Sequence, residues 1–394
     1  MFRTLTARQP DGIVLIMQAF AADDRPDKID LGVGVYRDTM GNTPVFAAVK
    51  AAERRLVETQ TSKGYVAPAG DPRFLQAMRA LVLGDGVEPA RVAALATPGG
   101  SGALQKAMEL VALARPEARL WLPDPTWPNH PPMVERSGLQ RLVYRYFDRA
   151  AGGLDRAGMW RDLAGLRPGD VVLVHGCCHN PTGTDLTPED WQALAHRITE
   201  AGALPLVDLA YLGLGQGLDA DATGLRLLAR RCPEMLVATS CSKNFGLYRD
   251  RVGLLLAVTE TPRDQAEVQR SLAWLNRVSI AFPPDHGAAV VTEILADPGM
   301  TAAWRTELET MRSRIGTLRR DFAAALQTET GSNRFAAFAE QVGMFSLLPA
   351  TPDQIAALRQ DHAIYVIGDG RINLAGLTDA TIGPAARAIA SVLG

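Results

Sequence analysis

Short apolar runs recur along the chain, and a turn of glycine or polar residues follows each of them. Segments with helical spacing separate most of these runs, and strands that alternate with helices predict a mostly parallel α/β sheet flanked by helices. Ligands of such sheets bind beyond the carboxyl ends of the strands, so we expect the polar motifs after the runs to converge on one site. The runs lie at residues 92–96, 119–122, 170–175, 204–208, 235–239 and 252–258.

The pattern changes towards the C-terminus. Apolar residues at helical spacing over residues 299–327 predict one long amphipathic helix that bridges two domains. From Arg334 onward, short apolar runs at 343–347, 365–367 and 371–374 alternate with helical segments. This part of the sequence predicts a smaller α+β domain beside the main sheet.

The composition excludes several classes of protein. With 394 residues, 47% of them hydrophobic and 21% charged, the chain has the profile of a globular protein with a large core. Its formal net charge of −2 gives no basic surface for nucleic acid or an anionic membrane. No apolar run reaches the ~20 residues of a membrane helix, and the N-terminus lacks the apolar core of a signal peptide. We therefore expect a cytoplasmic protein whose four cysteines are reduced thiols.

A lysine stands close to the end of one apolar run. Lys243 lies in a polar segment directly after the expected strand 235–239, where burial should lower its pKa. A lysine with a lowered pKa can attack a carbonyl carbon and bind it covalently. Ser240, Ser242 and Arg251 would donate hydrogen bonds to a phosphate, so the segment suits an aldehyde with a phosphate monoester, as in pyridoxal phosphate. For this segment alone, a surface lysine in a loop remains the alternative.

A second motif predicts an anion site. Residues 97–102, Thr-Pro-Gly-Gly-Ser-Gly, link the run at 92–96 to a helical segment at 103–113. Unpaired backbone N–H groups and the helix dipole favour a phosphate at such a helix start, which makes Gly100 and Ser101 candidate ligands. Glycine turns also serve as plain connectors, so that alternative stays open.

Other motifs offer the remaining groups that pyridoxal phosphate chemistry needs. Asp208, at the end of an expected strand, is the candidate that keeps the pyridine nitrogen protonated, with a helix or turn cap as its alternative. Asn180 and Tyr211 can donate to the ring oxygen, and Trp127 can stack on the ring. Arg371 offers a planar fork to a substrate carboxylate, with a surface salt bridge as its alternative.

The run His175-x-Cys177-Cys178-His179 resembles a metal cluster, but we set that interpretation aside. Zinc sites use spaced pairs of ligands, and adjacent cysteines on a chain are expected to point apart. We therefore expect no metal. His130 and His175 are interpreted as supporting residues that orient the carboxylate or the cofactor ring.

Four motifs together resemble one family, and they keep the family's order along the whole chain. They resemble the class I aminotransferases of pyridoxal phosphate fold type I, within these the aspartate and aromatic amino acid aminotransferases, and most closely the aromatic ones. The motifs are residues 124–130, 175–183, 240–253 and 370–376.

The resemblance implies a domain organisation. An N-terminal arm would comprise residues 1–11. A small domain would comprise residues 12–44 and 311–394, and a large domain that binds pyridoxal phosphate would comprise residues 45–310.

The resemblance also implies a role for each matching residue. Lys243 would bind the cofactor and carry a proton between the substrate Cα and the cofactor, with Asp208 and Tyr211 as the other catalytic residues. His130 would support Asp208, while His175 and Ala210 would lie near the ring. The other cofactor contacts would be Gly100, Ser101, Trp127, Asn180, Ser240, Ser242 and Arg251. The substrate contacts would be Arg371, Trp127, Asn180, Phe345 and Gly34, the last in an N-terminal lid.

Two further positions are expected to act across a dimer interface. Tyr65 would reach the phosphate in the neighbouring subunit. Arg277 would bind the side-chain carboxylate of aspartate or glutamate there. The resemblance therefore implies a homodimer with two shared sites.

Three residues that differ from those of the aspartate-restricted members of the family bear on the choice of substrate. Gly64, Ser101 and Phe282 replace an asparagine, a threonine and a polar residue of the aspartate-restricted members, and they resemble the aromatic aminotransferases. Because Arg277 is retained, we expect an enzyme of amino acid metabolism that acts on aromatic amino acids (tyrosine, phenylalanine, tryptophan) and dicarboxylic ones (aspartate, glutamate). The acceptor would be 2-oxoglutarate. A narrow aspartate aminotransferase is the alternative. A decarboxylase or lyase of the same fold is less favoured, since two arginines suit diacids.

Overall fold

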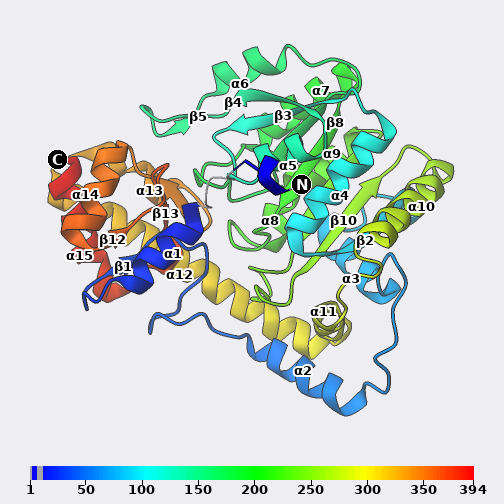
Figure 1. Ribbon diagram of the computed structural model, residues 1–394, viewed down its shortest axis with the longest axis horizontal. Helices are drawn as coiled ribbons and strands as arrows, with labels where there is room; N and C mark the ends of the chain where they lie inside the picture. Colours follow the sequence, from blue (N-terminus) through cyan, green and yellow to red (C-terminus); the bar gives the residue numbers. More distant parts are fainter. Residues whose placement is uncertain (1, 7–11) are drawn as a thin grey trace.

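The computed structural model describes residues 2–6 and 12–394, so residues 1 and 7–11 of the expected N-terminal arm lie outside the described residues. Within the described residues, a sheet of seven strands forms the centre (Figure 1), in the order β2-β10-β9-β8-β7-β3-β4. The strands are β2 (Val92–Pro98), β3 (Arg119–Asp124), β4 (Gln140–Arg145), β7 (Val171–His175), β8 (Leu204–Leu209), β9 (Met235–Ser240) and β10 (Val252–Val258).

The sheet is mostly parallel, as the sequence predicted. Only β10 pairs antiparallel, with β2 on one side and β9 on the other. The segment between β9 and β10 contains no helix, and a parallel neighbour requires a long crossover that is usually helical. The edge strand β4 was not expected from the sequence, because its residues are mostly exposed and form no continuous apolar run.

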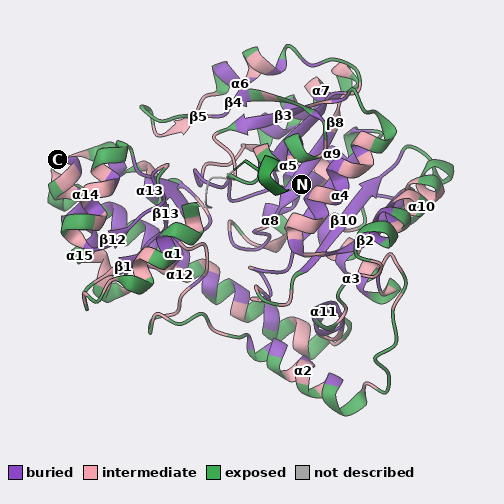
Figure 2. Ribbon diagram, in the orientation of Figure 1, coloured by how far each residue is buried: buried purple, intermediate pink, exposed green. Residues whose placement is uncertain are grey.

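Helices cover both faces of the sheet, because successive strand residues point to opposite sides. In β7, Val171 and Leu173 belong to a cluster with α4 (Gly99–Ala114) and α10 (Pro262–Ser279). Val172 and Val174 belong to a cluster on the other face with α7 (Pro188–Ala201) and α9 (Thr223–Arg231). Figure 2 shows the sheet buried between these layers.

One long helix joins two hydrophobic clusters. α12 (Pro298–Thr330) contains 33 residues and begins where the side chain of Asp297 accepts a hydrogen bond from the N–H of Met300. Its first half packs through Trp304 with the cluster of the sheet, and its second half packs through Phe322 with another cluster. The helix predicted over residues 299–327 is confirmed. Figure 1 shows it running from the main body to a smaller lobe.

The smaller lobe combines segments from both ends of the chain. β1 (Ile29–Asp30) pairs with β12 (Ile364–Tyr365), and β11 (Phe345–Leu347) pairs with β13 (Arg371–Asn373). The boundaries of the expected domains, 12–44 with 311–394 and 45–310, stay a prediction. The helices of this lobe are α1 (Gly12–Ala22), α13 (Ala337–Glu340), α14 (Pro352–His362) and α15 (Asp379–Leu393).

The remaining elements are short or peripheral. In the described part of the chain, no helix is both long and apolar enough to span a bilayer. The other α-helices are α2 (Ala47–Thr59), α3 (Pro72–Leu83), α5 (His130–Arg136), α6 (Arg156–Leu163), α8 (Leu218–Asp221) and α11 (His286–Ala296). A small hairpin consists of β5 (Phe147–Asp148) and β6 (Gly153–Leu154), and the 3-10 turns are η1 (Phe2–Thr4), η2 (Pro89–Arg91), η3 (Asn333–Phe335) and η4 (Leu374–Gly376).

Candidate functional site

Three neighbouring strands end at the same edge of the sheet. β7, β8 and β9 are parallel, and His175 at the end of β7 is in register with Asp208 of β8. The loops that follow these strands carry Asn180, Tyr211 and Lys243. Because the carboxyl ends of parallel strands meet at one edge, these polar residues come together as expected.

Lys243 faces an aromatic side chain in this group. Its Nζ atom lies 5.1 Å from the centre of the Tyr211 ring. Burial lowers the pKa of Lys243 to about 8, although the negative charge of Asp208 opposes this shift. The positive charges of Arg251 and Arg371 lower the pKa further. A substantial fraction of the amine is therefore neutral near pH 8, as nucleophilic attack and proton transfer both require.

A chain of polar contacts orients Asp208. Nε2 of His130 lies 3.2 Å from Oδ2 of Asp208, although not in the alignment of a hydrogen bond. The other ring nitrogen of His130, Nδ1, lies 2.7 Å from the hydroxyl of Thr126, which is also 3.3 Å from Nε2 of His175. Since His130 is fully buried, Thr126 and Asp208 together fix its orientation.

These contacts keep the carboxyl group of Asp208 ionised. Burial by itself raises its pKa, but the contact with His130 and the positive charge of Lys243 lower the net pKa below the usual value. Burial lowers the pKa of His175 to about 3, so its ring is neutral at physiological pH. An ionised, buried carboxylate can hold a protonated nitrogen of a ligand.

The start of α4 meets the end of β9. A Cβ added to Gly100 would lie 3.0 Å from Cβ of Ser240, so a larger residue there would push against the end of β9. Gly99 has φ 72°, and a Cβ there would lie 2.6 Å from Nη2 of Arg251. Nη1 of Arg251 donates to Oγ of Ser242 at 3.4 Å. Helix N–H groups, hydroxyls and a guanidinium thus surround one place that suits a phosphate ester.

Arg371 reaches this edge of the sheet from the smaller lobe. It lies on β13 and is only 2% exposed, so its alternative interpretation as a surface salt bridge does not hold. Its Nη1 donates to Oδ1 of Asn180 at 3.2 Å, and its Nη2 donates to the carbonyl of Gly32 at 3.4 Å. Asn180 also donates from Nδ2 to the hydroxyl of Tyr211 at 3.5 Å. The guanidinium is therefore held among the residues of the Lys243 group.

Aromatic and glycine residues enclose Arg371. Its Cζ atom lies 4.6 Å from the centre of the Phe345 ring, which stands edge-on to Tyr211 with the ring centres 5.9 Å apart. Gly34 contacts the same ring, because a Cβ there would lie 2.9 Å from Cζ of Phe345. A larger residue at position 34 would displace Phe345 from the guanidinium.

Trp127 and Ala210 lie at the borders of this group. Trp127 follows β3, and its ring stands edge-on to His130 with the ring centres 5.3 Å apart. Ala210 follows β8 and is half-buried. Ser101 lies in the first turn of α4. The contacts of these three residues with a cofactor stay a prediction.

Tyr65 and Arg277 gather at a different place. The ring of Tyr65 stacks on Phe282 with the centres 4.7 Å apart, and Cζ of Arg277 lies 5.3 Å from the centre of the same Phe282 ring. All three line a cavity of about 740 Å³ whose lining includes neither Lys243 nor Arg371. Tyr65 is 87% exposed. Within one chain, these residues do not join the Lys243 group.

Two positioning residues, Thr126 and Asn373, were not predicted from the sequence. Thr126 links the two histidines, although it lies in one of the motifs that carried the family resemblance. Asn373 donates from its side-chain amide to the carbonyls of Val33 and Val35 at 2.7 Å each, which fixes the segment that contains Gly34. Such contacts between distant segments leave no signal in local sequence patterns.

One expectation about the cysteines is wrong. The thiols of Cys177 and Cys178 do not point apart, because both sulfur atoms lie within 4.8 Å of each other and of a carboxylate oxygen of Asp221. The backbone of Cys178 is left-handed, with φ 51°, and this turn brings the two side chains to one side. His175 is not part of this group and clusters instead with His130 and Asp208.

The residues around Lys243 fit pyridoxal phosphate. They offer a lysine with a lowered pKa for the aldehyde, an ionised carboxylate for the pyridine nitrogen and an anion cradle at the start of α4. Tyr211 and Asn180 offer polar groups for the ring oxygen. The set matches each chemical part of that molecule.

Comparison with known proteins agrees with this geometry. A family model described as aminotransferase class I and II matches residues 26–389. The chain is 49% identical over 392 residues to an aromatic-amino-acid aminotransferase of Paracoccus denitrificans, with 100% of both chains covered. It is 42% identical over 400 residues to an aspartate aminotransferase of Salmonella typhi, again with 100% of both covered.

A solved structure shows the same fold. The aromatic-amino-acid aminotransferase of Burkholderia pseudomallei, covalently bound to pyridoxal phosphate, superposes with a TM-score of 0.97 at 35% identity. The match covers 100% of both chains.

Proposed function

The chain belongs to the class I and II aminotransferase family, and from this premise we propose that it transfers amino groups of aromatic and dicarboxylic amino acids to 2-oxoglutarate. The observation that carries the proposal is the gathering of Lys243, Asp208 and Arg371 at one edge of the sheet. A narrow aspartate aminotransferase is the second candidate, since aspartate enzymes are also full-length relatives.

Pyridoxal phosphate supplies an aldehyde for the amino group and a ring that withdraws electrons from the substrate Cα. We propose that Lys243 holds this cofactor when no substrate is bound. With substrate bound, the neutral Nζ of Lys243 would accept the proton from the substrate Cα and hold it for transfer within the site. Its pKa of about 8 keeps about half of the amine neutral near pH 8.

The remaining residues of the group would bind the cofactor and orient it. Asp208 holds the protonated pyridine nitrogen, and His130 and Thr126 keep its carboxylate in position. Tyr211 and Asn180, which contact each other, would bind the ring oxygen. The start of α4, with Gly100 and Ser101, holds the phosphate together with Ser240, Ser242 and Arg251.

Arg371 binds the α-carboxylate of the substrate, since its planar guanidinium offers two parallel N–H groups. Trp127 covers the ring, and Phe345 and Gly34 close the substrate side of the pocket and exclude water. With these roles, the reacting Cα would lie between Lys243 and Arg371.

We propose a homodimer in which Tyr65 and Arg277 of each subunit complete the site of the other. This explains why both residues lie apart from Lys243 within one chain. Arg277 would pair with the side-chain carboxylate of aspartate or glutamate. For an aromatic substrate it would remain on the ring of Phe282, where it lies here. The expected cytoplasmic location stays a prediction.

A single-turnover titration tests the proposal. The cofactor bound to Lys243 absorbs visible light, and this band is lost when an amino acid donates its amino group. We expect loss of the band with aspartate and also with phenylalanine, tyrosine and tryptophan. Response to aspartate and glutamate alone would establish the narrow aspartate enzyme. Turnover by a Lys243→Ala variant would contradict the role of Lys243, and Lys50→Ala, an exposed lysine on α2, is the control.

A further inference from the structure

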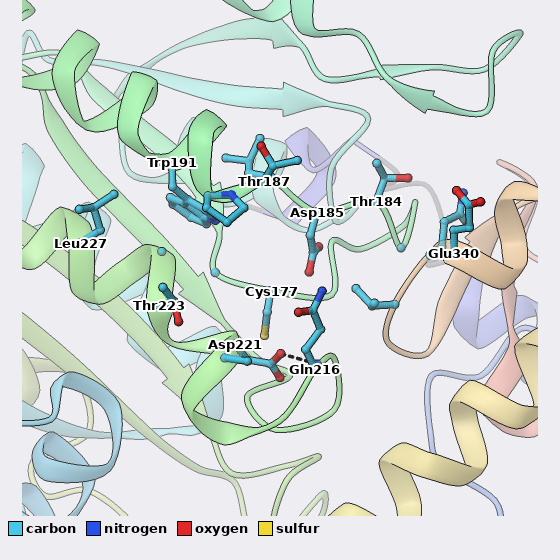
Figure 3. Close-up of a pocket in the computed structure, with 18 of the residues that line it drawn as sticks. Cys177, Thr184, Asp185, Thr187, Trp191, Gln216, Asp221, Thr223, Leu227 and Glu340 are labelled. Carbon is cyan, nitrogen blue, oxygen red and sulfur yellow. Dashed lines mark hydrogen bonds between the residues drawn. The ribbon is translucent and has the colours of Figure 1, made fainter.

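A second cavity lies away from the Lys243 group. It has a volume of about 580 Å³, and its lining contains none of Lys243, Asp208 and Arg371. Cys177 and Asp221 lie on its wall. Figure 3 shows the Cys177 sulfur pointing towards Asp221, with the carboxylate of Asp185 directed into the same space.

Two thiols and one carboxylate converge here, although Cys178 lies behind Cys177 and Asp221 and does not line the cavity. The sulfurs of Cys177 and Cys178 and an oxygen of Asp221 lie within 4.8 Å of one another. Glycines pack against Cys178 from two sides: a Cβ on Gly343 would lie 2.8 Å from its sulfur, and one on Gly215 would lie 3.1 Å from it. The close packing fixes the thiol in this place.

Asp221 is a buried carboxyl group that forms no ion pair with a described residue. The side chain is buried, and backbone N–H groups alone hold it: Oδ2 accepts from Gly213 at 2.8 Å and from Gly215 at 3.0 Å, and Oδ1 accepts from Gln216 at 2.6 Å. The three N–H groups orient the carboxylate, in the way that hydrogen bonds from neighbouring residues orient the ligands of a metal ion. Oδ1 keeps a lone pair that could bind a cation.

Asp185 adds a second carboxyl group to the same wall. Its Oδ2 accepts from the N–H of Cys178 at 2.7 Å, and its Oδ1 accepts from the N–H of His179 at 2.8 Å. No described residue forms an ion pair with it either. Asp221 is buried, whereas Asp185 is half-buried and lies within the electrostatic influence of Arg319. Two carboxyl groups without an ion pair beside one cavity favour a cation.

We propose that Cys177, Cys178 and Asp221 form a binding site for one thiophilic divalent metal ion of the zinc class. Sulfur ligands select zinc and related soft ions over magnesium or calcium. The metal displaces one proton from each thiol, so M²⁺ and two thiols give the dithiolate complex and two protons, with no change of oxidation state. Asp221 is the third ligand, and water from the cavity fills the fourth position of a tetrahedron.

The site would act on the loop that serves the cofactor. Asn180 follows Cys178 by two residues and contacts both Arg371 and Tyr211. A metal that fixes Cys177 and Cys178 therefore also restrains the position of Asn180. Because the ion binds only the folded chain, it raises the temperature of unfolding.

The experiment is a titration of the pyridoxal phosphate enzyme with Cd²⁺. A cadmium–thiolate bond gives an ultraviolet charge-transfer absorption that neither histidine nor carboxylate ligands produce. We expect this absorption to saturate at one Cd²⁺ per subunit, with release of two protons, and to be reversed by excess Zn²⁺. The unfolding temperature should rise on addition of Zn²⁺.

Matched variants locate the bound ion. Cys232→Ala removes a buried thiol that contacts Thr199, not the cavity, and should leave the absorption unchanged. Cys177→Ala and Cys178→Ala should abolish it, and Asp221→Asn should weaken the affinity by about tenfold or more. The visible band of the bound cofactor reports that each variant is folded. Absence of the absorption in the unaltered enzyme, or its persistence in a folded Cys177→Ala variant, would overturn the proposal.

Discussion

Nη1 of Arg371 donates to Oδ1 of Asn180 at 3.2 Å, although the two residues are 191 positions apart in the sequence. One lies on β13 of the smaller lobe and the other in the loop after β7 of the main sheet. The hydrogen bond joins the proposed carboxylate-binding group to the proposed cofactor-binding group. Through this pair, the proposed binding of the substrate carboxylate is linked to the contact between the smaller lobe and the main sheet.

Replacement of Arg371 should lower the activity towards every substrate. Arg371→Ala removes a buried charged donor, and we expect kcat/KM to fall by about 10²-fold or more for both phenylalanine and aspartate. Arg371→Lys should retain only part of the original kcat/KM, because an ammonium group lacks the planar arrangement of donors of a guanidinium group. Steady-state kinetics with both amino acids provide the measurement. A loss confined to one substrate class would show that Arg371 does not bind the α-carboxylate.

Replacement of Arg277 should separate the two substrate classes. In Arg277→Leu, we expect kcat/KM for aspartate to fall by about 10²-fold, while the value for phenylalanine stays within about threefold. Arg270→Leu on the same helix removes an exposed arginine that pairs with Glu267 and serves as the control. Equal losses for both amino acids would contradict a role restricted to dicarboxylates.

Phe282 should favour the aromatic mode. The ring of Phe282 stacks on Tyr65 and also lies against the guanidinium of Arg277. Phe282→Asn removes both contacts. We expect the ratio of kcat/KM for phenylalanine to that for aspartate to drop by about tenfold, because an unpaired amide is poorly matched to an aromatic ring. An unchanged ratio in competition assays with both amino acids would exclude this residue as a determinant of specificity.

Attachment of the cofactor should follow the ionisation of Lys243. Burial lowers its pKa to about 8 from 10.5, so the reactive neutral amine is half populated near pH 8. We expect the rate of pyridoxal phosphate binding to the apoenzyme to rise with pH up to about 8 and then to level off. With an ordinary lysine the rate would keep rising to about pH 10. Stopped-flow absorbance across this range provides the measurement.

The same shift affects the stability of the apoenzyme. Between pH 8 and 10.5 the unfolded lysine binds more protons than the folded one, so the free energy of unfolding should rise with pH in this window. A Lys243→Met apoenzyme lacks this contribution. Its stability advantage over the unaltered apoenzyme should therefore shrink as the pH rises from 8, which denaturant titrations at several pH values would reveal.

Thr126 should act through His130. Thr126→Val keeps the shape of the side chain but removes the hydroxyl that contacts Nδ1 of His130. We expect kcat to fall by about tenfold with KM little changed, since the hydroxyl fixes the histidine beside Asp208. The pH dependence of the absorption of the bound cofactor should also shift. Thr126→Ser should restore activity and spectrum, an outcome that a mere packing defect would not give.

The sequence by itself determined the fold class and predicted the candidate residues of the main site. Continuous apolar runs predict buried parallel strands, and polar motifs at their carboxyl ends predict one site, because this edge of the sheet is where strand ends meet. Lys243, Asp208 and Arg371 were identified for the same reason, since each lies at a strand end or beside a glycine turn. The edge strand β4 escaped prediction, because an exposed strand needs no apolar run.

Only the tertiary structure decided the contacts between distant segments. It placed Thr126 between two histidines and Asn373 against the segment of Gly34, pairings that leave no periodic pattern in the sequence. It also overturned the expectation that adjacent cysteines diverge, because the side-chain direction of Cys178 depends on a left-handed backbone that the surrounding packing imposes. Local patterns determine which elements form, whereas the packing of those elements decides which side chains meet.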